Sequence, residues 1–262
     1  MVLECIPEYI RAKEWAEISL KYGLNFEYNE FFNPDVLEDK ARTKEIINIY
    51  KSLGRDTKND TLHGAFLDIT VSSRDPLIKN ASDLRVRQSL DIAMELGVRG
   101  VVFHTNYLTG FKSGTYRKNW TDANIEYWSR KCEEYRELDI YLENMFDESP
   151  ELLSKVAEGL SDKQNFGVCL DIAHACLSGC DIHEWIKALA GHIKHIHIND
   201  NDGLEDLHLQ VGSGIIDWTV LKEKALFECD PSVLIEVSGF EKLEGSYDYL
   251  KKAGFCSREV LK

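Results

Sequence analysis

The chain has 262 residues, of which 44% are hydrophobic, and its formal net charge is −14 at neutral pH. This length fits one large domain, or less readily two small ones, and the apolar fraction is enough for a real core. The acidic charge opposes a broad interface with nucleic-acid phosphates, and no apolar stretch approaches the length that spans a bilayer.

The amino terminus and the cysteines favour a cytoplasmic location. Residues 1–7 lack the basic region and the long apolar region of a signal peptide. The seven cysteines are an odd number scattered along the chain, which fits reduced thiols better than a disulfide framework. We therefore expect a cytoplasmic protein without a membrane-spanning segment.

Strand and helix signals alternate along the whole chain, with no linker and no low-complexity tract. We expect strands near residues 1–6, 24–31, 60–67, 98–104, 139–145, 166–172, 193–199 and 232–237. Strand 24–31 has the weakest signal, because its polar and apolar residues alternate where a barrel strand should be mostly apolar. Eight βα units predict an α/β fold, a single (β/α)8 TIM barrel over residues 1–262.

Two helices have clear signals. One is expected to begin at Thr121 or Asp122, either of which can cap it, and to carry apolar residues at helical spacing as far as Leu138. The other carries Leu243 and later apolar residues, and its basic last turn is followed by Gly254.

Charged or imidazole side chains close four successive apolar strands in the second half of the chain. Glu143 follows Ile140–Leu142, Asp171 follows Val168–Leu170, and Glu236 follows Val233–Ile235. His197 lies in the strand between the last two. Because the carboxyl ends of barrel strands form one face, these four side chains are predicted to surround one divalent ion. Three carboxylates and one imidazole suit Mn²⁺, Mg²⁺ or Co²⁺ and also accept Zn²⁺. A single acid of this kind is usually a surface or salt-bridged residue, but four in step favour a site.

A second set of polar residues falls at or beyond predicted strand ends. It comprises His63, His104, His174, Asp206 and His208. A lone strand histidine is more often a hydrogen-bonded core residue, and we interpret His195 in that way. For the second set, clustering favours further metal ions or contacts with substrate hydroxyls.

Other residues are weaker candidates for the functional site. Lys112, Arg117 and Lys118 follow the fourth strand and could meet a substrate phosphate, although a solvated loop is the preferred interpretation. Three aromatic side chains, Phe66, Phe146 and Trp218, could line a pocket, but aromatic residues at strand ends usually cover the core. The cysteines near the ligands show no metal-binding spacing, and we expect them to be packing residues.

Three motifs resemble one known superfamily. They are Asp171-Ile172-Ala173-His174, the run from His197 to Gly203, and the run from Asp206 to Trp218. They look like the xylose isomerase-like TIM barrels, a group that holds sugar and sugar-phosphate isomerases and epimerases together with the apurinic-site nuclease endonuclease IV. The resemblance covers nearly the whole chain and is strongest from the fifth strand onward.

The resemblance implies two sets of roles. In the epimerase branch, Glu143, Asp171, His197 and Glu236 would hold one metal, the two glutamates would move a proton, and His174 would contact a substrate oxygen. In the nuclease branch, a three-zinc cluster would be held by these four residues together with His63, His104, His174, Asp206 and His208. All nine residue types are present. The arginine that ketose epimerases tend to carry after the seventh strand is replaced by Asn201–Glu205.

The predicted function is isomerisation or epimerisation of a sugar, sugar phosphate or related polyol with a divalent metal. Glu143 and Glu236 would move the proton through an enediolate, and His63, His104 and His174 would contact the substrate. A zinc endonuclease acting at abasic DNA is the alternative, and the acidic charge disfavours it. A non-catalytic metal- or sugar-binding barrel is the second alternative, disfavoured by the two candidate bases. The expected partner is a small sugar substrate. The sequence does not decide whether the chain forms a homo-oligomer.

Overall fold

Eight parallel strands close into a barrel in the order of the chain, β1 to β8. The computed structural model describes residues 2–255, so Met1 of the first predicted strand and residues 256–262 of the predicted domain lie outside it. The strands are β1 Val2–Cys5, β2 Asn25–Tyr28, β3 Thr61–His63, β4 Gly100–His104, β5 Asp139–Glu143, β6 Phe166–Asp171, β7 Ile193–Ile198 and β8 Ser232–Ile235. The predicted (β/α)8 TIM barrel is confirmed, and each predicted strand overlaps an observed one.

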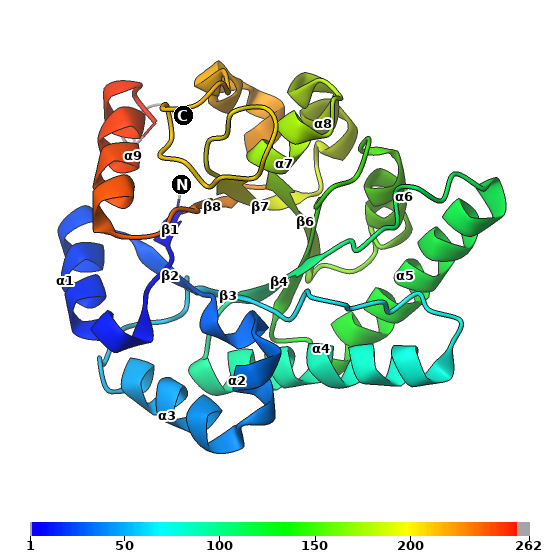
Figure 1. Cartoon of the computed structure of the whole chain (residues 1–262), viewed down its shortest axis with the longest axis horizontal. Coiled ribbons are helices and arrows are strands. Elements are labelled where there is room, and N and C mark those ends of the chain that lie inside the picture. Colours follow the sequence, from blue (N-terminus) through cyan, green and yellow to red (C-terminus); the bar gives the residue numbers. More distant parts are fainter. Residues whose placement is uncertain (1, 256–262) are drawn as a thin grey trace.

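Helices surround the strands as an outer ring (Figure 1). The α-helices are α1 Ala12–Tyr22, α2 Pro34–Glu38, α3 Lys40–Lys51, α4 Pro76–Leu96, α5 Gly114–Glu134, α6 Glu151–Gly159, α7 Ile172–Leu177, α8 Ile182–Leu189 and α9 Phe240–Lys252. Between β7 and β8 the helical part consists of two 3₁₀ helices, η3 Trp218–Lys222 and η4 Lys224–Phe227. Two further 3₁₀ helices, η1 Tyr9–Arg11 and η2 Glu30–Phe32, flank α1 and β2.

The predicted start of the helix after β4 is wrong. Helix α5 begins at Gly114, with Ser113 as its cap, so Thr121 lies within the helix and donates to the carbonyl oxygen of Arg117. Arg117 and Lys118 are therefore helical residues and not part of a loop. The polar stretch before Thr121 has no apolar spacing that signals a helix. The helix at 243–252 is confirmed, with Gly254 in the left-handed conformation just after its end.

The main core lies between the strands and the ring of helices. Trp15 of α1, Trp128 of α5 and Trp185 of α8 are among the largest fully buried side chains in it. No helix within residues 2–255 is both long and apolar enough to cross a membrane. The six cysteines of this part of the chain are all free of disulfides, as the sequence predicts.

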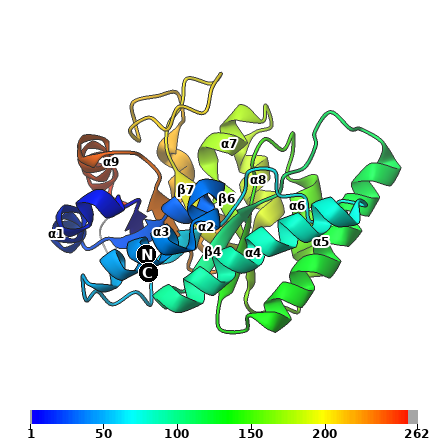
Figure 2. The ribbon, with the colours of Figure 1, turned by 60° about the horizontal axis from the view of Figure 1, so that its bottom comes forward.

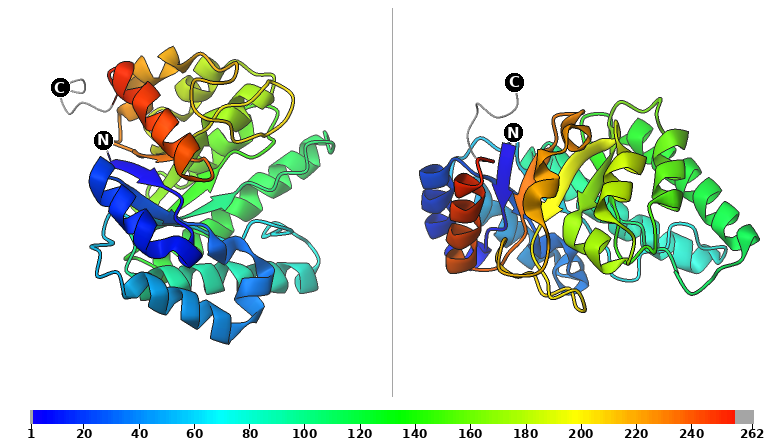
Figure 3. Two further views of the ribbon diagram at one scale, coloured as in Figure 1. Left: turned by 60° about the vertical axis from the view of Figure 1, so that its left-hand side comes forward. Right: turned by 90° about the horizontal axis from the view of Figure 1, so that it is seen from above.

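Two long connections rise from the same end of the barrel. Residues 199–217 connect β7 to η3, and residues 105–113 connect β4 to α5. Figures 2 and 3 show that both project from the end at which the strands finish. This is the end to which the fold brings the predicted site residues.

Candidate metal centre

The four residues of the predicted metal set converge at the carboxyl ends of β5 to β8. Glu143 and Asp171 end their strands, His197 is the penultimate residue of β7, and Glu236 follows β8 directly. Asp171 pairs with His197 in the parallel register, so both side chains point to the same side. All four side chains are buried. The strand geometry therefore gathers three carboxyl groups and one imidazole at one enclosed point.

The Nδ1 atom of His197 lies between two of these carboxylates. It is 3.4 Å from Oε1 of Glu143 and 3.4 Å from Oε2 of Glu236. Asn199 links the remaining groups, because its amide nitrogen donates to Oδ2 of Asp171 at 3.4 Å and to Oε2 of Glu236 at 3.2 Å. Asn199 was not predicted as a site residue, because an asparagine at the end of a strand is typical of an ordinary turn.

These spacings fit a divalent ion. Ligand atoms that each lie ~2.1 Å from one ion are roughly 3.0–3.4 Å from each other. Nδ1 of His197 and Oε2 of Glu143 are buried without a hydrogen-bond partner in residues 2–255. Buried polar atoms normally have partners, so these free donor atoms point to a ligand that completes them. Glu143, Asp171 and His197 each offer one ligand atom, and these three atoms all lie within 4.8 Å of one another.

A second group of potential ligands shares Glu143. Nε2 of His63 lies 3.1 Å from Nε2 of His104, and these atoms are 3.6 and 3.3 Å from Oε2 of Glu143. His104 pairs with Glu143 in the register of β4 and β5. The two carboxylate oxygens of Glu143 thus face different histidines, with Oε2 toward this pair and Oε1 toward His197.

The third group lies at the outer edge of the site. Oδ2 of Asp206 is 3.2 Å from Nε2 of His174 and 3.1 Å from Nε2 of His208. His174 also contacts Glu143, with its Nδ1 3.4 Å from Oε1. The fold therefore brings together all nine residues that the sequence singled out. Their roles as ligands stay a prediction.

A buried aspartate holds the connection that carries Asp206 and His208. The carboxylate of Asp200 accepts from the backbone nitrogens of Asn201, Gly212 and Ile216, and from Nε1 of Trp218. Trp218 is buried by this contact, so it covers the core. The sequence offered no signal for Asp200, because three of its four partners are backbone nitrogens of an irregular segment.

The electrostatics of the ion-free site are dominated by close carboxylates and imidazoles. Burial opposes ionisation of Glu143, but the charge of His197 outweighs it and holds the pKa of Glu143 well below its ordinary range. Burial raises the pKa of Asp171 to about 7. Burial is likewise outweighed at Glu236, where His197 and His208 lower the pKa to about 2. Neighbouring charges outweigh burial at His174 and His197 and hold the pKa of each well above its ordinary range, whereas burial lowers the pKa of His104.

Beneath this layer, the barrel interior holds further polar groups that the sequence analysis missed. Glu4 of β1 and Glu27 of β2 are fully buried and both contact the hydroxyl of Thr61. His195 lies within hydrogen-bond distance of Ser232 and Glu27, which confirms it as a hydrogen-bonded interior residue. The alternation of strand β2 has its cause here, because Glu27 turns inward to meet His195.

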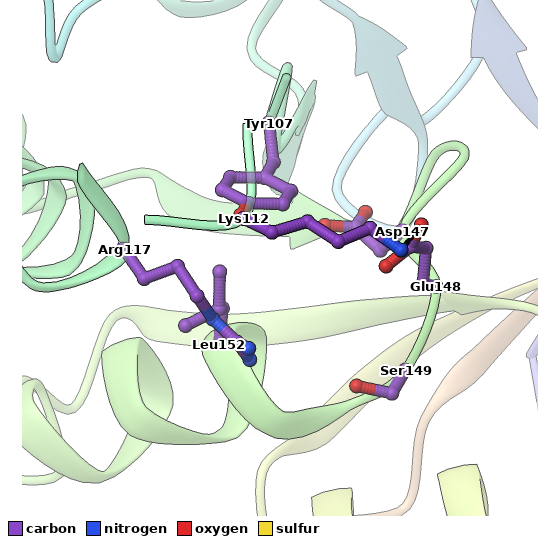
Figure 4. Close-up of a pocket in the computed structure, with 7 residues that line it drawn as sticks. All are labelled: Tyr107, Lys112, Arg117, Asp147, Glu148, Ser149 and Leu152. Carbon is purple, nitrogen blue, oxygen red and sulfur yellow. Dashed lines mark ion pairs between the residues drawn. The ribbon is translucent and has the colours of Figure 1, made fainter. Parts of the chain in front are cut away.

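The residues proposed for phosphate contact lie outside this centre. Lys112 and Arg117 line a separate cavity of about 50 Å³ (Figure 4). Each is paired with an acid, Lys112 with Glu148 and Arg117 with Glu151. Lys118 pairs with Asp122 on α5. These ion pairs favour the structural interpretation of the three cations.

Two aromatic side chains flank the site histidines. The ring of Phe66 stacks on His104 with centroids 4.5 Å apart. The ring of Phe146 lies 5.5 Å from that of His174 and is exposed. Phe66 and Phe146 thus lie against site histidines, whereas the sequence favoured a core-covering role for aromatic residues at strand ends.

Residues 22–243 match the family described as xylose isomerase-like TIM barrel. The chain belongs to this family. Among curated relatives, an uncharacterised protein of Methanocaldococcus jannaschii, MJ1311, is 29% identical over 62% of this chain and 58% of its own length. A probable endonuclease 4 of Mycobacterium leprae is 26% identical over 61% of this chain and 66% of its own length. The chain thus spans less than two thirds of either relative.

Solved structures share the fold over almost the full chain. The TTHB071 protein of Thermus thermophilus, from a crystal soaked with ZnCl₂, superposes with a TM-score of 0.77 at 24% identity, covering 98% of this chain and all of that one. A D-tagatose 3-epimerase-like protein gives 0.75 at 23% identity, covering 96% of both chains. At these identities the likeness concerns the fold alone.

Proposed function

We propose that this chain is a divalent-metal-dependent isomerase or epimerase of a sugar or related polyol. The observation that carries the proposal is the convergence of Glu143 and Glu236 on His197, with one carboxylate oxygen of each 3.4 Å from Nδ1. Two carboxylates at one point can serve the two faces of a substrate carbon. The epimerase-like neighbour of similar fold supports the same class.

Glu143, Asp171, His197 and Glu236 would hold the ion. When bound, it would supply Lewis-acid polarisation of a substrate carbonyl and neighbouring hydroxyl oxygen. Glu236 is the better placed base, because Oε2 contacts His197 and Asn199 while Oε1 has no hydrogen-bond or ion-pair partner within residues 2–255. It would remove the proton next to the carbonyl, and Glu143 would return one to the enediolate. His174, His104 and His63 would orient substrate hydroxyls.

A zinc phosphodiesterase is the second candidate, and one observation favours it. All three ligand groups are assembled, and Glu143 joins two of them as a shared carboxylate. Metal clusters of this type suit phosphodiester cleavage. The similarity to a probable endonuclease 4 of Mycobacterium leprae supports this candidate. The net charge of −14 and the paired cations of Lys112 and Arg117 oppose a DNA-binding rim.

Solvent exchange separates the two candidates. Protein loaded with Mn²⁺ or Zn²⁺ is incubated in D₂O with a panel of ketoses, aldoses and their phosphates, and deuterium on carbon is measured by NMR. Proton transfer should label one carbon, which phosphodiester cleavage cannot do. A duplex with an abasic site is tested in parallel at low salt, where phosphate contacts are strongest. Strand cleavage without exchange on any sugar would overturn the proposal in favour of the nuclease.

A further inference from the structure

The two ring nitrogens of His197 face different surroundings. Nδ1 faces the carboxylates of the candidate metal centre, as described above. Nε2 faces the interior of the barrel, where Oε1 of Glu27 lies 3.3 Å away. Glu27 comes from β2, which is not a neighbour of β7 in the barrel, so this contact crosses the barrel interior.

Nε2 of His197 and Oε1 of Glu27 face each other at ion-pair distance. Both atoms are buried, and neither has a hydrogen-bond partner in residues 2–255. A buried imidazole N–H and a buried carboxylate oxygen both need a partner. A small tightening of the 3.3 Å separation satisfies both atoms with one hydrogen bond.

The carboxylate of Glu27 is itself held in place. Its second oxygen, Oε2, accepts from the hydroxyl of Thr61 at 2.7 Å and lies 3.0 Å from Nε2 of His195. Nδ1 of His195 in turn lies within hydrogen-bond distance of the hydroxyl of Ser232. Because Oε2 is occupied on two sides, Oε1 cannot turn away from His197 without breaking these contacts.

We propose that Glu27 is the positioning residue of the metal centre, holding His197 with its proton on Nε2 and Nδ1 free to bind an ion. A carboxylate behind a histidine ligand fixes the tautomer and the ring orientation and makes the imidazole a better donor to metal. The positioning of His197 by Glu27 does not depend on the reaction. Only the catalytic use of the bound ion rests on the proposed function. The positioning role concerns Glu27 alone of the interior carboxylates, because Glu4 contacts Thr61 and Arg99 and not His197.

Zn²⁺ affinity tests the role directly. A glutamate offers two acceptor oxygens, whereas glutamine offers one acceptor and one donor amide. In Glu27→Gln the oxygen should stay with Thr61 and His195, which leaves the amide N–H₂ toward His197. Competition with a chromophoric chelator should then show Zn²⁺ bound roughly 10–100-fold more weakly. Glu4→Gln is the matched control, since it changes an equally buried carboxyl of the same layer, and it should leave affinity unchanged.

The tautomer of His197 gives a readout that a general loss of stability does not move. In the Zn²⁺-loaded wild-type protein, ¹⁵N NMR of the imidazole should show the ion on Nδ1 and the proton on Nε2, facing Glu27. In Glu27→Gln this N–H loses its acceptor, so the Nε2 resonance of the loaded protein should shift. Circular dichroism and thermal unfolding of each variant establish that it is folded, and Glu27→Leu, which removes the acceptor without adding a donor, provides a second variant.

Three results would overturn the role: an ion on Nε2 of His197 in the Zn²⁺-loaded wild type, unchanged Zn²⁺ affinity in folded Glu27→Gln, or an equal loss in Glu4→Gln. The last would indicate instead an ion held by Glu4, Glu27 and His195, whose ligand atoms also lie within 4.8 Å of one another. A wild type that binds Zn²⁺ with the expected tautomer but exchanges no sugar proton would reject the proposed function and leave the role of Glu27 intact.

Discussion

Oδ2 of Asp200 accepts a hydrogen bond from Nε1 of Trp218 at 2.9 Å, which ties the end of β7 to the start of η3. The same carboxylate binds the backbone nitrogens of Gly212 and Ile216. Gly214 packs so closely that an added Cβ would lie 2.3 Å from Oδ1 of Asp200. One buried side chain therefore shapes the connection that presents Asp206 and His208 to the site.

Asp200→Ala should loosen this connection and lower metal binding by Asp206 and His208, because their backbone would no longer be held. Stability should fall by at least about 1.5–3 kcal/mol, the value of one hydrogen bond to a charged group. Urea unfolding and elemental analysis measure the two effects. Glu205→Ala, at an exposed acid of the same connection, is the control, and equal behaviour of the two variants would contradict the assignment.

Removing site histidines should lower the amount of bound metal. After loading with excess Zn²⁺, His104→Ala and His208→Ala should each bind less than the wild type while remaining folded by circular dichroism. Glu143→Gln should lose more than either, since Glu143 faces two ligand groups. His183→Ala, at an exposed histidine of α8, should bind as much as the wild type. Unchanged zinc in His104→Ala would assign His104 to substrate contact or packing.

Glu236→Gln should slow deuterium exchange into the substrate by roughly 10²–10⁴-fold, the effect typical of losing a general base. The amide keeps an oxygen for His197 and Asn199, so the fold and much of the metal binding should persist. NMR of the exchanged sugar measures the rate. Glu244→Gln on α9 serves as the control because this glutamate contacts Lys21 and Tyr22, away from the site. Wild-type exchange rates in Glu236→Gln would exclude Glu236 as the base.

The interior glutamate Glu4 should make stability depend on pH. Burial, reinforced by the charge of Glu27, raises the pKa of Glu4 from 4.5 to about 8. Between pH 4.5 and about 8, Glu4 holds a proton in the folded chain that the unfolded chain releases. The stabilisation that protonated Glu4 contributes to the folded state is therefore fully present below pH 4.5 and is lost as the pH rises to about 8. Relative to Glu4→Gln, the metal-free wild type should lose at most about 1.4 kcal/mol per pH unit in this window. Urea unfolding at pH 5 and pH 8 measures it, and a constant difference would contradict a neutral Glu4.

The sequence predicts the barrel and its mouth well, because both leave local signals. Apolar runs mark the strands, and a charge at the end of such a run is conspicuous, as at Glu143 and Asp171. Glu27 was not predicted as a site residue, because its meaning depends on His197, which lies far away in the chain and across the barrel. Asp200 was not predicted for a different reason, because its partners are three backbone nitrogens and one indole nitrogen, which leave no pattern in the sequence. The start of α5 was wrong because its first turns carry polar residues, and polar residues alone do not distinguish a helix from a loop.

The carboxylate of Glu143 divides its two oxygens between His104 on one side and His197 on the other. Two ions bound through one carboxyl group cannot have independent affinities. Whatever factor the first ion imposes on the second, the second imposes on the first, since coupling free energy is reciprocal. The proportion of mononuclear and polynuclear centres would then change gradually with the metal concentration. The reaction that the barrel supports would depend on the metal ions available as well as on its sequence.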